Sequence, residues 1–178
     1  MKLSSAAFLL MTLSGANFIV TQSAREVARP SAELKKQDYF VGTWTLEGTT
    51  KSSPFGPGGQ KFKSTEQLEW MPGGFFLLVH SYTAGKLAGV TVIGYDSQEK
   101  VFTHTSFNST GETELWKGTA ENDRWEWTRD ETLNGKLVQE RLAIKKISPN
   151  SYSFLVVMRP AEGSNWSTVA EGTGTKTS

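Results

Sequence analysis

The stretch VGTWTLEGTT at residues 41–50 sets a tryptophan two positions after a glycine, at the start of a strand-like run. Side chains alternate between the faces of a strand, so Trp44 and Leu46 share one face. Gly42 lets the chain turn sharply into this strand. We expect the large Trp44 ring to close the narrow end of a small β-barrel, beneath a preceding helix. Contact between Trp44 and a ligand is the alternative.

The first 24 residues have the features of a secretory signal peptide. Lys2 precedes the uncharged stretch LSSAAFLLMTLSGANFIV, and the small residues of TQSA come before the charges at Arg25 and Glu26. This order predicts cleavage near Ala24 and export to the periplasm or beyond the cell. The apolar stretch is short and interrupted for a membrane span, so we expect no stable membrane anchor.

Cleavage at this point leaves 154 of the 178 residues, which suits a single domain with a sizeable core. The chain has 19 basic and 18 acidic residues, and the loss of Lys2 makes the two numbers equal. Without a net positive field, we expect no nucleic-acid partner. The chain has no cysteine, which excludes disulfides and cysteine nucleophiles.

One helix and then only strands are predicted along the mature chain. Pro30 and Ser31 start the helix and Gly42 ends it. Turn residues then recur about every ten positions, and Asn134-Gly135 is a strong hairpin signal. Strands are expected near 42–50, 60–70, 75–83, 87–95, 100–108, 112–119, 124–130, 136–147, 151–159 and 166–173. The expected division is a signal peptide at 1–24, an N-terminal segment and helix at 25–41, and one β-barrel domain at 42–176.

Alternation indicates which face of each strand is buried. In KFKSTEQLEW, residues 61–70, the face with Phe62 and Trp70 also has Glu66, while lysines and other polar residues occupy the opposite face. Trp125 and Trp127 likewise share one face of RWEWTRD. Ten half-buried strands in succession have two exposed edges unless the sheet closes. The sequence therefore predicts an all-β fold, an antiparallel up-and-down barrel of about ten strands that encloses a cavity.

Five stretches in order along the chain carry a family resemblance: LKKQDYFVGTWTLEG, STEQLEWMPGGFFL, IGYDSQEKVF, FNSTGE and SPNSYSF. They resemble the bacterial DUF1579 family, a set of proteins of unknown function with a calycin-like barrel. The resemblance extends from about Leu34 to Gly172. It implies the fold and no particular activity. The Gly-x-Trp at the first strand is similar to that of lipocalins, fatty-acid-binding proteins and nitrobindin.

The candidate binding residues are those whose alternation points them into the barrel. Glu66 is the carboxylate expected in the cavity, with Arg129 and Glu140 as candidate structural partners. His80 and His104 are expected on the third and fifth strands, and their registers stay open because FFLLV is apolar on both faces. The candidate ligand-binding set is Glu66, Trp70, His80, His104, Trp125, Trp127, Phe154 and Met158.

Binding of a small hydrophobic or amphiphilic molecule is the function we expect from this lining. The alternative is an enzyme that uses Glu66 with His80 or His104 as acid and base. Similarity to nitrobindin raises haem as a third reading, but the final strands here contain no histidine beyond His104. We expect no metal site, no cofactor and no assigned catalytic residue. The oligomeric state stays open.

Overall fold

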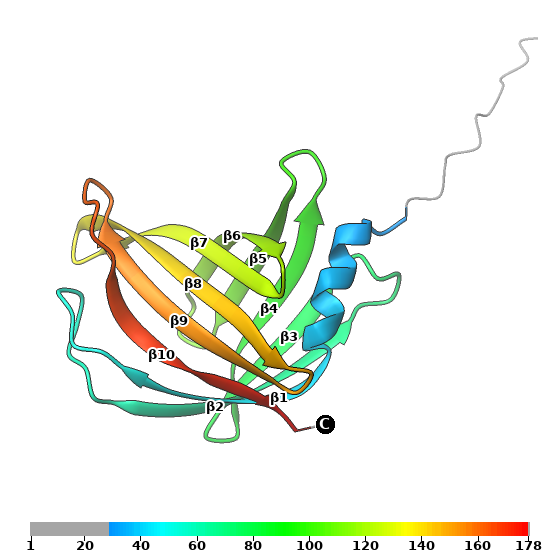
Figure 1. Ribbon diagram of the computed structural model, residues 1–178, viewed down its shortest axis with the longest axis horizontal. Helices are drawn as coiled ribbons and strands as arrows, with labels where there is room; N and C mark the ends of the chain where they lie inside the picture. The colour runs from blue at the N-terminus through cyan, green and yellow to red at the C-terminus, as the bar shows by residue number, and fades with distance from the viewer. Residues whose placement is uncertain (1–28, 178) are drawn as a thin grey trace, which may run out of the picture.

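The computed structural model describes residues 29–177 and shows a closed barrel of ten antiparallel strands with one helix at its end (Figure 1). The expected signal peptide at residues 1–24 lies outside the described residues. Each strand pairs with its neighbours in sequence, and β1 pairs with β10 to close the sheet. The predicted all-β up-and-down barrel is confirmed. Within residues 29–177 there is no helix with the length and apolarity to cross a membrane.

The strands are β1 Gly42–Thr50, β2 Lys61–Trp70, β3 Leu77–Thr83, β4 Lys86–Asp96, β5 Val101–Asn108, β6 Thr113–Glu121, β7 Arg124–Leu133, β8 Lys136–Ser148, β9 Ser151–Pro160 and β10 Ser167–Lys176. They follow the ten predicted segments in order. Turn residues set these limits because glycine and asparagine adopt the left-handed backbone that tight hairpins require, as Asn134 and Gly135 do between β7 and β8.

The helix η1, Ala32–Phe40, is of the 3-10 type and lies across one end of the barrel (Figure 1). The side chain of Ser31 caps it by accepting a hydrogen bond from the Glu33 backbone N–H. Its buried side chains are Leu34, Gln37 and Phe40, which face the barrel. The helix thus lies where the sequence predicts it.

Trp44 lies under this helix and is fully buried. Its indole Nε1 donates a hydrogen bond of 2.8 Å to the backbone oxygen of Phe40. The ring contacts those of Tyr39 and Tyr152, with centroid distances of 5.3 and 5.0 Å. Gly42 has a φ of 123°, which lets the chain leave the helix and enter β1. These contacts hold Trp44 between the helix and the start of β1.

Glycines make room for aromatic rings at the junction of β9, β10 and β1. A Cβ atom on Gly174 would lie 2.2 Å from the Tyr152 ring, and one on Gly172 would lie 2.5 Å from the Phe154 ring. Both rings therefore lie directly against the backbone of β10. The repeated glycines near the end of the chain are thus a packing device at the closure of the barrel.

We expect Trp44→Ala to lower the free energy of unfolding by roughly 3–5 kcal/mol, because it removes a fully buried ring. Urea denaturation followed by circular dichroism measures the loss.

The matched control is Trp166, which lies between Arg141 and Arg159 with guanidinium-to-ring distances of 4.3 and 4.7 Å. Trp166→Ala removes only these partly exposed contacts, so we expect a loss of about 1 kcal/mol or less. A loss below about 1 kcal/mol for Trp44→Ala would contradict the plug assignment.

Candidate functional site

The interior of the barrel is closed by buried side chains at the helix end and keeps accessible apolar surface beyond them. Register places Leu46, Leu142 and Val156 on the same inward face as the buried Trp44, Trp127 and Phe154. These three apolar side chains nevertheless keep solvent-accessible surface. Phe62 on the same face is 37% exposed. Interior surface of this kind means that side chains do not fill the half of the barrel away from the helix.

Glu66 points into this interior from β2. Its cross-strand neighbours are Trp44 on β1 and Ser81 on β3, which all share the inward face. No side chain or backbone group among residues 29–177 makes a hydrogen bond or an ion pair with its carboxylate. The sequence candidates for its partner, Arg129 and Glu140, bind one another instead.

Burial raises the pKa of Glu66 from 4.5 to about 7. The cause is loss of hydration, which disfavours the charged form of a carboxylate. Burial also raises the pKa of Tyr152, and the negative charge of Glu66 contributes to that rise. Glu66 and Tyr152 are therefore electrostatic neighbours near the floor formed by Trp44.

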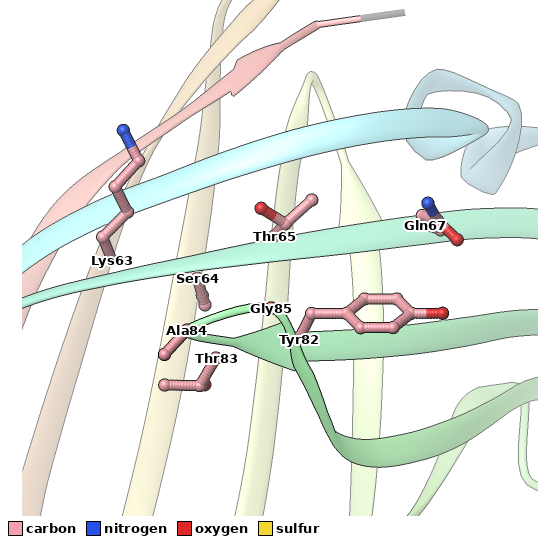
Figure 2. A pocket seen from close by; sticks show the side chains of 8 residues that line it. All are labelled: Lys63, Ser64, Thr65, Gln67, Tyr82, Thr83, Ala84 and Gly85. Carbon is pink, nitrogen blue, oxygen red and sulfur yellow. The ribbon is translucent and has the colours of Figure 1, made fainter.

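His80 lies on the outer face of the barrel. It is the register partner of Gln67 on β2 and of Val90 on β4, whereas Glu66 pairs with Ser81. Figure 2 shows a hollow along β2 and β3. On β2, the Lys63 and Thr65 side chains point to one side of the strand and the Ser64 side chain points to the other. Because residues alternate, His80 and Glu66 face opposite sides of the wall.

His104 lies on the inner face of β5, with Ile93 and Trp116 as its cross-strand neighbours. Its Nε2 is 2.7 Å from Ser106 Oγ, which is in turn 2.6 Å from Thr91 Oγ1. Burial, with a smaller contribution from the charge of Arg129, lowers the pKa of His104 to about 4. The imidazole is therefore neutral at neutral pH and belongs to a short chain of hydrogen-bonded groups.

Glu66 and His104 do not meet. They lie on β2 and β5, three strand spacings apart around the wall, each of about 4.8 Å. No hydrogen bond joins the two side chains within residues 29–177, and no group of three histidine, aspartate or glutamate side chains there could hold a metal ion.

A second polar group lies on the inward face farther from the helix and is centred on Arg129. The guanidinium is 2.7 Å from Glu140, 3.0 Å from Glu131 and 3.4 Å from Glu114. It also stacks over the Trp116 ring at 4.7 Å. Arg129 is thus shared among three carboxylates, and the group has an excess of negative charge.

The aromatic candidates divide between the floor and the walls. Trp125 stacks on Tyr39 at 5.4 Å, and Trp70 Nε1 donates a hydrogen bond of 2.8 Å to Asp38, so both hold the helix. Trp127 lies against His104 at 5.2 Å. Phe154 and Met158 are buried on the inner face of β9. Trp127, Phe154 and Met158 therefore belong to the walls.

Sequence reasoning missed several polar residues of the interior. Ser106 follows His104 by two positions, and Glu114 precedes Trp116 by two, so alternation alone carries the signal for both. Gln37 carries no such signal. It lies in the helix with its side chain fully buried against the barrel, and neither polar atom of its amide has a hydrogen-bond partner within the described residues.

Comparison with known proteins supports this fold. Rv2717c from M. tuberculosis has a TM-score of 0.53 and 12% sequence identity, over 84% of this chain and 99% of that one. A protein of unknown function from the DUF3598 family of Nostoc punctiforme has a TM-score of 0.27 and 8% identity, over 83% of this chain and 100% of that one, and supports no argument. No curated protein matches the sequence.

The model of one protein family matches residues 29–175, which include the helix and nearly the whole barrel. Its description is "Protein of unknown function (DUF1579)". This match confirms the resemblance found in the sequence motifs. The chain belongs to the DUF1579 family.

Proposed function

We propose that the barrel binds a small, mainly apolar molecule in its interior. The observation that carries the proposal is the accessible surface of inward-facing apolar side chains, among them Leu46, Leu142 and Val156. Apolar surface left in contact with water costs about 25 cal/mol for each Å², so a ligand that covers it is stabilised. A few polar groups among apolar walls are typical of ligand sites.

The alternative, acid and base catalysis by Glu66 with a histidine, lacks the contact that it needs. A general acid and base act within hydrogen-bond reach of a shared substrate. His80 faces outward, and His104 is held by Ser106 three strands away from Glu66. The arrangement of these side chains therefore supports ligand binding better than acid and base catalysis.

We expect Val156→Trp to weaken the binding of the neutral fluorescent probe N-phenyl-1-naphthylamine at least tenfold, because the larger ring occupies the interior between Leu142 and Ala170. Probe fluorescence and quenching of tryptophan emission measure the affinity.

The matched control is the adjacent Leu155, which faces outward and is 38% exposed. Leu155→Trp should leave the probe affinity within about twofold of the unchanged protein. Equal affinity for the unchanged barrel and a folded Val156→Trp variant would show that the probe binds elsewhere.

Glu66 makes the free energy of unfolding of the barrel depend on pH. Its pKa is higher in the fold, at about 7, than the 4.5 of an unperturbed carboxyl, so the folded state binds this proton more tightly. The associated stability is complete below pH 4.5 and is lost as the pH rises to about 7.

Glu66→Gln removes this ionisation. The difference in unfolding free energy between the variant and the unchanged protein should shift by about 1–3 kcal/mol in favour of the variant when the pH rises from 4 to 8. One pKa unit is worth about 1.4 kcal/mol. Urea melts at the two pH values measure the difference. Glu69→Gln, on the exposed face of the same strand, is the control and should show no such gain. A Glu66→Gln variant whose relative stability is the same at both pH values would place the carboxylate in water.

We also propose that the protein is exported, on the basis of the uncharged stretch at residues 3–24. N-terminal sequencing of the protein from its producing cell should begin near Arg25. Leu10→Arg places a charge within the apolar stretch and should leave an intact Met1. Recovery of intact Met1 from the unaltered protein would contradict export.

A further inference from the structure

Within residues 29–177, no group forms a hydrogen bond or an ion pair with the Glu66 carboxylate near the barrel floor. The Trp44 indole N–H already donates to Phe40, and Ser81 makes no hydrogen bond to Glu66. Lys176 is the other cross-strand neighbour of Trp44, and its ammonium lies 5.5 Å from that ring without an ion pair to Glu66. A partly buried carboxylate in this setting gains most from a cation or an N–H donor supplied by a ligand.

The second polar group disfavours an acidic ligand. Arginine is the side chain that best binds a carboxylate, but Arg129 already contacts Glu114, Glu131 and Glu140. One positive and three negative groups leave an excess of negative charge on the inward face. A ligand carboxylate would meet repulsion there and again at Glu66, whereas a cation would be attracted at both places.

The walls suit a cation with an apolar body. The buried rings of Trp44 and Tyr152 lie beside Glu66 and form an apolar floor around its carboxylate. Leu142, Val156 and Phe62 supply apolar surface for the remainder of the molecule.

We propose that the ligand of this barrel is an amphiphile with a protonated amine, whose ammonium group binds Glu66 while its apolar body lies along the inner walls. This inference rests on the proposed binding function and specifies the chemical class of the ligand.

Three probes with the same ten-carbon chain test the class: decylamine, decanol and decanoate. The experiment measures the concentration at which each ligand displaces N-phenyl-1-naphthylamine from the barrel at pH 8, where Glu66 is mainly ionised. We expect decylamine to act at a concentration at least tenfold below that of decanol, and decanoate to be the weakest of the three.

Glu66→Gln should bring decylamine to within about threefold of decanol, with each displacement referred to the naphthylamine affinity measured for that variant. Glu66→Met, which also removes the hydrogen-bonding groups, serves as a second variant. Glu69→Gln is the matched control on the outer face of β2 and should keep the full preference for the amine. Circular dichroism establishes that each variant is folded.

The outcomes separate the two proposals. If the unaltered barrel does not bind the naphthylamine at all, the binding function itself fails. If it binds the probe but the three ten-carbon ligands displace it equally, or decanoate displaces it best, the amine class is wrong while binding stands. A preference for decylamine that persists in both Glu66 variants would also overturn the proposed contact.

Discussion

The hydrogen bond from Trp44 to the Phe40 backbone joins the helix to the barrel, and the arrangement of the interior follows from it. The fully buried ring fixes where the helix ends and where β1 begins. It also forms the floor of the barrel, and Glu66 is its cross-strand neighbour on β2. A large aromatic ring at this point closes one end of the barrel beneath the helix.

The interior distributes its charges unequally. Arg129 contacts carboxylates and the Trp116 ring, so its positive charge is compensated by groups of the protein itself. Glu66 has no corresponding partner among the described residues and has a raised pKa. Stability alone does not favour an unpaired carboxylate that has lost part of its hydration, because desolvation costs free energy. Such a group at the floor of an accessible interior is more consistent with a role in binding.

Alternation in the sequence predicts much of this arrangement. It places Trp44, Glu66, Arg129 and Glu140 on the inward face, and the register agrees, although Arg129 and Glu140 pair with each other and not with Glu66. Strand order and barrel closure could also be derived, because short turns leave few alternatives to a meander.

His80 shows where alternation is ambiguous. The outer face near it is also apolar, with Leu78 and Val90 half buried, so both faces of β3 look like a core. The unpartnered amide of Gln37 was beyond prediction for another reason. Its burial depends on how the helix meets the barrel, and the helix has a polar sequence with few apolar side chains.

The pairing of β1 with β10 also affects how the chain folds. Every other pair of neighbouring strands is consecutive in sequence, but Leu46 pairs with Gly174 across almost the whole barrel. During synthesis, β1 therefore keeps one edge without a partner until the last strand has emerged. Until β10 is available, the free edge of β1 can pair with another chain. Aggregation is therefore most favoured in the period before β10 pairs with β1.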